Sequence, residues 1–348
     1  MTGTKNLHRF ILFTTICTFV LLIAGGLVTS TSSGLSVPDW PTTYGRFMFS
    51  YPLDQMVGGI LYEHTHRMIA SIVGFLTVIA AFWTWRREER KWVRILGLAA
   101  LGAILLQGLL GGLTVLFLLP TTISASHATL AQTFFMIMVI LSVVTSSWWK
   151  TAPAPLETPG GVRLRALTLW TTAAIYVQLI LGAVMRHMDA GLAVPTIPLA
   201  YGQLFPSLSP AALDQYSRYL IDSNLRLAAD GTLTAGQIVI HLLHRYWAVI
   251  VALSVGASVF ASLRRRGQFR QGVGVAVLLF VLLLIQVALG ILTVLSGKGV
   301  EITTAHVATG AALLGTSLLL HLHARRRFAV GAADPAIDLR PAVGKALS

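Results

Sequence analysis

Four of the ten histidines occupy matching places in the two halves of the chain, where they could bind a metal or a cofactor. His66 and His127 lie in the first half, and His244 and His306 lie at nearly the same separation in the second. Imidazole inside an apolar segment is costly unless it is paired, so these residues are candidates for function. A single histidine could equally hydrogen-bond a neighbouring helix or interfacial water. The duplicated pattern favours ligation.

The kind of ligand follows from the number of donors. Haem iron takes two axial imidazoles, which facing helices of one bundle can supply. Zinc or copper usually needs a third protein ligand. Cys17 is the single cysteine, and no carboxylate cluster accompanies the histidines. A proton-relay transporter is least favoured, because acidic residues are almost absent from the apolar segments. The pattern therefore predicts haem binding.

Charged residues flank two of the histidines. Glu63 precedes His66 by one helical turn, so both side chains share a face, and the matching residue in the second half is His241. A carboxylate beside a bound macrocycle could donate or accept a proton. The alternative is an interfacial glutamate that faces water. Arg67 and Arg245 directly follow their histidines and are candidate ligands of haem propionates, unless they extend to the lipid headgroups.

The chain that must position these residues is strongly apolar. Of its 348 residues 55% are hydrophobic and only 11% are charged, against about 25% charged residues in soluble domains. An ordinary soluble enzyme is therefore not expected. Eight apolar runs are long enough to cross a bilayer, and the first is interpreted as a retained span, not a cleaved signal peptide. The runs lie at 10–29, 57–84, 93–118, 123–148, 166–186, 238–262, 273–295 and 303–323.

The net charge of +13 is unevenly placed along the chain. With eight spans, most basic residues fall on one side of the membrane, which the positive-inside rule makes cytoplasmic. They precede residue 10, lie within 86–94, 150–165 and 264–270, and follow residue 324. We therefore expect an all-α integral membrane protein with both termini in the cytoplasm. The basic excess marks topology, and no nucleic-acid partner is expected.

The two halves of the chain are repeats of each other. Gln107-x-x-Leu-Gly111-x-Leu-Thr-Val recurs as Gln286-x-x-Leu-Gly290-x-Leu-Thr-Val. Each half has four spans, an even number, so the halves run in the same direction. This predicts two tandem, parallel-related four-helix bundles, each able to hold a cofactor among its helices. The expected parts are an N-terminal half, a cytoplasmic linker rich in proline and glycine, and a C-terminal half, at 10–150, 151–165 and 166–325.

Two longer loops are expected on the outer side, at 30–56 and 187–237. The second contains an amphipathic stretch at 213–227, which predicts a short helix on the membrane surface. Near the cytoplasmic end of the last span, His321 and His323 are interpreted as solvated histidines.

Taken together, these residues resemble the haem A synthase family over nearly the whole chain. The resemblance rests on the Glu63-x-x-His66-Arg67 motif, on His127, and on the repeated histidines of the second half. It also rests on the segment 25–41, Gly-Gly-Leu-Val-Thr-Ser-Thr-Ser-Ser-Gly-Leu-Ser-Val-Pro-Asp-Trp-Pro. The resemblance implies a membrane oxidoreductase that converts the C8 methyl group of haem O to a formyl group. The product, haem A, would serve terminal oxidases.

The resemblance also implies a division of labour between the halves. The C-terminal half would hold haem b as cofactor through His244 and His306, and the N-terminal half would take the substrate at His66 and His127, with Glu63 catalytic. Haem O synthase and a second copy of the chain are candidate protein partners, besides membrane lipid. The expected location is the bacterial cytoplasmic (inner) membrane. The alternative function is a di-haem b-type electron-transfer cytochrome that modifies neither haem.

The chain departs from the family pattern at two places. Many bacterial members carry a cysteine pair in the first outer loop, where this chain has Val37 and Thr43, so a thiol role there cannot apply. Members also often have an arginine where Thr29 stands, whereas the second half keeps Arg186 at the matching position.

Overall fold

The computed structural model describes residues 2–225 and 232–329. Within them, eight helices are long and apolar enough to cross a membrane, which confirms the all-α membrane fold. These are α1 (Thr2–Ser30), α2 (Gly59–Arg87), α3 (Lys91–Leu116), α4 (Thr121–Thr145), α6 (Pro159–His187), α8 (Ala235–Arg264), α9 (Arg270–Leu295) and α10 (Val300–Arg327).

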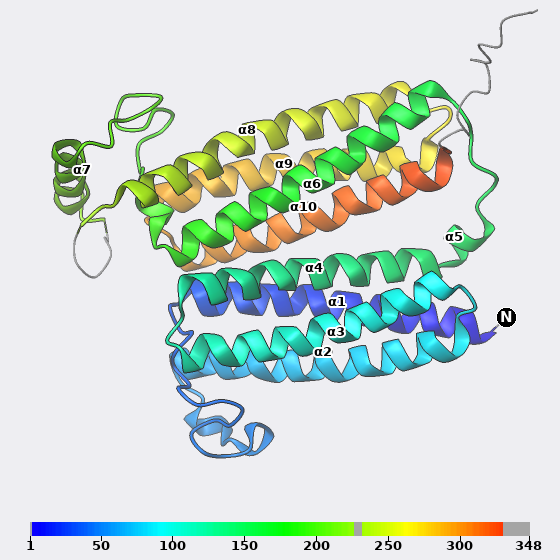
Figure 1. Ribbon diagram of the computed structural model, residues 1–348, viewed down its shortest axis with the longest axis horizontal. Coiled ribbons are helices and arrows are strands. Elements are labelled where there is room, and N and C mark those ends of the chain that lie inside the picture. Colours follow the sequence, from blue (N-terminus) through cyan, green and yellow to red (C-terminus); the bar gives the residue numbers. More distant parts are fainter. Residues whose placement is uncertain (1, 226–231, 330–348) are drawn as a thin grey trace, which may run out of the picture.

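The eight helices lie in two groups of four (Figure 1). One group comprises α1 to α4, and the other comprises α6, α8, α9 and α10. Between the groups, α1 packs against α10, and α4 packs against α6 and α10. Each group has an apolar core of its own, around Phe134 and Met138 in the first and Leu279 and Leu314 in the second. In the repeat, α1 corresponds to α6 and α4 corresponds to α10. The contact of α1 with α10 therefore corresponds to that of α6 with α4, as expected for a duplication.

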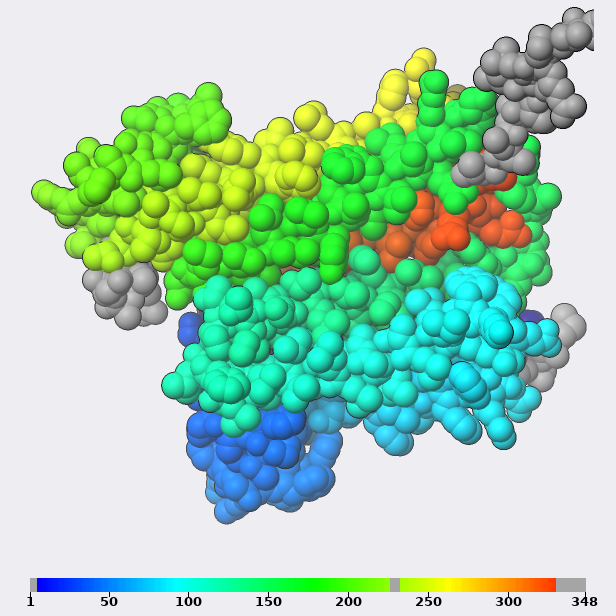
Figure 2. All heavy atoms as spheres, in the orientation of Figure 1, coloured from blue at the N-terminus to red at the C-terminus, as the bar shows by residue number. Residues whose placement is uncertain are grey.

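The two ends of the helices differ in character. The described parts of both long connections, 31–58 and 188–225 with 232–234, lie at one end, which we call the loop end, and the first projects beyond the helices (Figure 2). The arginine-rich turns lie at the other, which we call the basic end. The short helices are η1 (Met48–Ser50), η2 (Leu53–Gln55) and η3 (Ala190–Leu192) with α7 (Pro210–Asp222) at the loop end, and α5 (Ser147–Thr151) at the basic end.

The amphipathic stretch does form a helix, α7, but its buried face packs on the protein itself. Tyr216 and Leu220 are buried together with Val194 of the second loop and Ile238 of α8. The Tyr216 ring also stacks on Tyr201, with centroids 3.9 Å apart. Amphipathic periodicity shows that one face is covered and does not show by what, so the expected lipid contact is replaced by protein for these residues. Residue 227 lies outside the described residues.

At the basic end, the buried carboxylate of Glu88 links α2 to α4 and α5 through ion pairs and hydrogen bonds. Glu88 lies 2.8 Å from Arg90 Nε and 3.5 Å from Lys150 Nζ, and Arg90 also donates to the Val144 carbonyl of α4. Burial raises the pKa of Glu88, but the hydrogen bonds and charge of Arg90 outweigh it and lower the pKa to about 2.

Helix α6 begins at Pro159, inside the expected linker, because the Thr158 side chain caps it and proline suits the first turn.

Candidate functional site

All four repeated histidines lie near the loop end, within the first three turns of their helices. His66 lies on α2 and His127 on α4, while His244 lies on α8 and His306 on α10. Within each half the two helices that carry the histidines pack against the same two neighbours, which are α1 and α3 in the first half and α6 and α9 in the second. The fold therefore brings together the pairs that the sequence predicts, one pair in each group of helices.

Two of the imidazoles rest against glycines of the neighbouring helix. A Cβ atom at Gly25 of α1 would lie 3.1 Å from Cε1 of His66, and one at Gly182 of α6 would lie 3.0 Å from Cε1 of His244. Ordinary van der Waals contacts of a Cβ atom are 3.4–4 Å. Any larger residue at these places would push the ring, so the two glycines set the position of the imidazoles.

The other two histidines share a second arrangement, of a glycine and a glutamine. A Cβ atom at Gly111 of α3 would lie 3.1 Å from Cε1 of His127. Gln107, one turn earlier, places its amide Nε2 3.3 Å from His127 Nε2 and donates to the His127 carbonyl. In the second half, the corresponding distances to His306 are 3.2 Å for Gly290 and 3.3 Å for Gln286. In the sequence this motif indicates only the duplication of the chain. Its recurrence in both halves could also have predicted that its glutamine and glycine contact the repeated histidines.

The donor set fits haem better than a metal ion held by protein alone. Among the described residues, no group of three or more His, Cys, Asp or Glu could hold a metal ion, whereas haem iron needs only two axial ligands. An imidazole that ligates iron through one nitrogen needs a hydrogen-bond partner for the other. Here buried ring nitrogens and buried amide oxygens both lack partners: Nδ1 of His66, His127 and His306, and Oε1 of Gln107, Gln178 and Gln286.

Glu63, one helical turn before His66, is buried and does not face water, since only 3% of its surface is exposed. Oε1 lies 2.6 Å from Nη2 of Arg67, and Oε2 accepts a hydrogen bond of 2.8 Å from the backbone N–H of Val37. Both oxygens are therefore held from different directions, by a helix neighbour and by the first loop. This excludes the alternative of an interfacial glutamate and fixes the orientation of the carboxylate.

Arg67 and Arg245 bind the backbone of the loops that cover the two sites. Their acceptors are carbonyls of equivalent residues, Val37 (2.7 Å) and Asp39 (2.7 Å) for Arg67, and Val194 (2.8 Å) and Thr196 (2.9 Å) for Arg245. The structure thus gives each guanidinium a loop-anchoring contact, which satisfies backbone carbonyls of the loops, instead of an extended position toward lipid headgroups. Binding of propionates by these arginines stays a prediction.

The second half has an imidazole where the first has its carboxylate. His241 is buried, its Nδ1 lies 2.8 Å from the Ala190 carbonyl, and its Nε2 lies 3.3 Å from Nη2 of Arg245. The neutral ring therefore takes the place of Glu63 between the loop and the arginine. At the departure noted on α1, the Thr29 hydroxyl donates to the Gly25 carbonyl of its own helix.

The interpretation of the last two histidines as solvated is wrong for His321. Its ring is buried and Nδ1 lies 3.2 Å from Thr168 Oγ1 of α6. His323 is partly buried and stacks on Trp148, with centroids 4.1 Å apart. The cause is that α10 packs on α6 and α9 of its own group and also on α1 and α4 of the other, so that even its basic end is covered.

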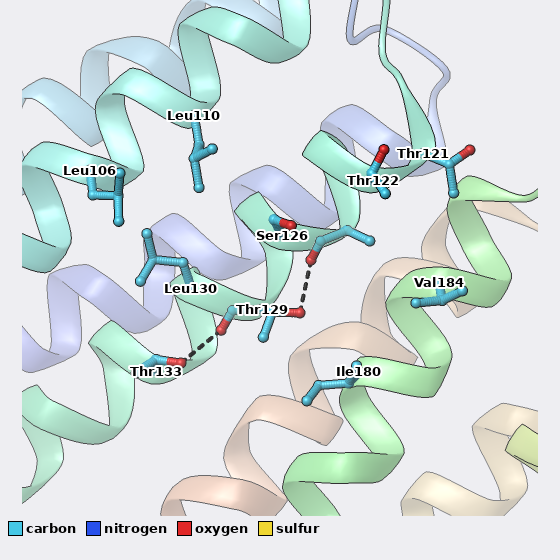
Figure 3. Close-up of a pocket in the computed structure, with 11 residues that line it drawn as sticks. Leu106, Leu110, Thr121, Thr122, Ser126, Thr129, Leu130, Thr133, Ile180 and Val184 are labelled. Atoms are coloured by element: carbon cyan, nitrogen blue, oxygen red, sulfur yellow. Dashed lines mark hydrogen bonds between the residues drawn. The ribbon is translucent and has the colours of Figure 1, made fainter.

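A groove of about 510 Å³ opens between α3, α4 and α6 (Figure 3). Leucines such as Leu106 and Leu130 line one side, and a row of hydroxyls that includes Ser126 and Thr129 follows α4. Thr133, at one end, hydrogen-bonds the Tyr176 hydroxyl across the two halves at 2.6 Å. None of the four histidines lines this groove, so it is separate from the candidate site.

The fold and the site define a duplicated, multi-pass helical membrane protein with one pair of partly buried histidines in each half. The model of the COX15-CtaA family, cytochrome oxidase assembly protein, matches residues 8–318. The chain therefore belongs to this family of cytochrome oxidase assembly proteins.

Its relatives include several bacterial proteins named Heme A synthase. The one from Halalkalibacterium halodurans is 26% identical over 314 residues, which cover 90% of this chain and 95% of that protein. The one from Geobacillus kaustophilus is 28% identical over 343 residues, which cover 95% and 96% of the two chains. The one from Shouchella clausii is 30% identical over 213 residues, 60% of this chain and 68% of that protein.

Proposed function

We propose that this protein is a haem A synthase, a membrane enzyme that oxidises the C8 methyl group of haem O to a formyl group. The observation that carries the proposal is a pair of partly buried histidines repeated in both halves, with a buried carboxylate one helical turn from a histidine in only one half. Relatives named Heme A synthase, similar to this chain over almost their whole length, support the same reaction. The product, haem A, would serve the assembly of cytochrome oxidase, in keeping with the family.

The two halves take different haems in this proposal. His66 and His127 hold haem O in the N-terminal half, and His244 and His306 hold haem b in the C-terminal half. A haem b bound there would supply electron transfer. The assignment is supported by Glu63, whose carboxylate lies among the helices of the N-terminal half only, because a residue that serves the reaction belongs beside the substrate.

Glu63 is the catalytic residue of this proposal. Its carboxylate is desolvated and is held by the Arg67 guanidinium and by the Val37 N–H, so it enters the reaction without having to be oriented first. The group can accept a proton at Oε1 or Oε2 while substrate is oxidised, and Arg67 keeps it in place through both protonation states. The neutral His241 in the second half offers no equivalent anion.

The setting of the enzyme follows from the same distribution of charges. The basic end faces the cytoplasm, with both termini, so the haem sites lie toward the outer leaflet of the bacterial inner membrane. Haem O reaches the N-terminal half from haem O synthase, and a homo-oligomer is a further proposed interaction. Membrane lipid surrounds the exposed apolar side chains of the helices.

The test is haem extraction and mass analysis after co-expression with a source of haem O. Glu63→Ala should retain haem b and form no haem A, whereas Glu301→Ala, an exposed glutamate at the start of α10, should behave like the parent. Loss of all haem from Glu63→Ala would make Glu63 a structural residue. Unchanged haem O with the parent protein would favour the electron-transfer cytochrome.

A second pair of variants tests the division between the halves. His244→Ala should empty the haem b site and leave haem O binding at the other pair, whereas His66→Ala should leave the haem b content unchanged. Equal loss of haem b from both variants would overturn the assignment of the halves. The absorbance of b-type haem in the purified protein measures both outcomes.

A further inference from the structure

Three of the four candidate ligand histidines have a glutamine amide beside the ring, and His66 has none. The amide nitrogens lie 3.2 Å from Nδ1 and Nε2 of His244 for Gln178, 3.3 Å from Nε2 of His127 for Gln107, and 3.3 Å from Nε2 of His306 for Gln286. Within the described part of the chain, the ring of His66 has no hydrogen bond, and its Nδ1 is buried without a partner.

The residue that replaces this glutamine beside His66 can be identified from the repeat. Gly25 on α1 and Gly182 on α6 contact Cε1 of their histidines in the same way, so they are structurally equivalent. One helical turn before Gly182 stands Gln178, and one turn before Gly25 stands Leu21. Leu21 is buried in the apolar core of the N-terminal half and offers the ring no polar atom.

Gln178 can hold its histidine in one orientation. Its Nε2 donates to the His244 carbonyl at 3.0 Å, which fixes the side chain across the ring, and its Oε1 is buried without a partner. Because the His244 carbonyl holds the amide nitrogen, the amide stays against the ring and limits the rotation of the imidazole. Removing outer contacts that fix the orientation of a ligating imidazole typically costs about 10–100-fold in affinity for the metal.

We propose that Gln178 is a positioning residue that makes the C-terminal site retain its haem, and that Leu21 leaves His66 free to release haem from the N-terminal site. A substrate site must discharge its product after each turnover, whereas a cofactor site must not. This inference rests on the proposed function for the assignment of the two halves. It assigns the difference in the rate of haem release between the two sites to one pair of equivalent residues, Leu21 and Gln178.

The test measures the transfer of haem from the purified holoprotein to excess apomyoglobin, with mass analysis of the transferred haem. Gln178→Leu should release haem b about 10-fold faster than the parent. Leu21→Gln should release haem A about 10-fold more slowly, so that product stays on the protein. Leu21→Met, which fills the same space without an amide, is the matched control and should release both haems at the parental rates.

Two further readouts separate positioning from a merely structural role. Gln178→Glu keeps the shape of the side chain but lacks the N–H that the His244 carbonyl accepts, so it should release haem b as fast as Gln178→Leu. The electron paramagnetic resonance signal of oxidised haem b, which reports the orientation of the axial imidazoles, should shift in Gln178→Leu. Parental signals and release rates in Gln178→Leu would overturn the proposal.

The outcomes also distinguish this inference from the proposed function. If Leu21→Gln slows the release of haem b, and Gln178→Leu speeds the release of haem A, then the halves are reversed and the proposal falls with their assignment. If Leu21→Gln and Leu21→Met release haem A equally fast, the halves stand and the role given to residue 21 is wrong. Should the protein form no haem A at all, the rate of haem b release from Gln178→Leu still decides the role of Gln178.

Discussion

A single methyl group at residue 182 should damage the C-terminal haem site while leaving the helix intact. A Cβ atom there would lie 3.0 Å from Cε1 of His244, against an ordinary contact distance of 3.4–4 Å, so the ring must move by about 0.4–1 Å. Constellations of ligands tolerate displacements of only about 0.5 Å. Since disturbed support of a ligand costs about 10–100-fold in affinity, we expect Gly182→Ala to weaken haem b binding at least about 10-fold.

The same substitution should not destabilise the protein without haem. Alanine is more favourable than glycine within a helix by about 1 kcal/mol, so thermal unfolding of the haem-free variant in detergent should begin no lower than that of the parent. Gly256→Ala is the matched control, because Gly256 also lies on a helix of this half and a Cβ atom there meets nothing within 4 Å. Parental haem b affinity in Gly182→Ala would refute the packing argument and with it the position assigned to His244.

Three further changes test the contacts that hold the frame. Arg245→Gln removes the hydrogen bonds that hold Val194 and Thr196 of the second loop and should make the segment 188–209 more sensitive to protease, measured by the rate of cleavage. Because the pKa of Glu88 is lowered in the folded state, its stabilisation is present above about pH 4.5 and lost as the pH falls toward 2; Glu88→Gln should flatten this dependence of the melting temperature. Tyr176→Phe breaks the 2.6 Å hydrogen bond between the halves and should cost about 0.6 kcal/mol of unfolding free energy in denaturant titration.

The spans and the pairing of the histidines could be predicted from the sequence because both leave a direct pattern in it. An apolar run of about 20 residues matches the thickness of a bilayer and is seldom needed to form a soluble core. A repeat with an even number of spans places equivalent residues at one depth, which is why His127 and His306 could be paired with the histidines of α2 and α8. The start of α6 could not be read from hydropathy, since the helix is begun by a polar cap at Thr158.

The parts that could not be predicted depend on which helices face each other. The contacts of Gly25 with His66, and of Gln178 with His244, join different helices whose relative rotation leaves no mark in either segment. The burial of His321 was missed for the same reason, because a ring beside arginines reads as exposed unless α10 is known to be central. Contacts between helices therefore carried most of the new information about the site.

The differences between the halves lie on one side of each site. Gln107, Gly111 and His127 are repeated without change as Gln286, Gly290 and His306. The exchanges are found on α1 and α2 against α6 and α8, as Leu21 for Gln178, Thr29 for Arg186 and Glu63 for His241. A side that is the same in both halves cannot distinguish a retained haem from one that is oxidised and released. The features that separate substrate from cofactor must therefore reside on the α1–α2 side, where the carboxylate is added and the amide is removed.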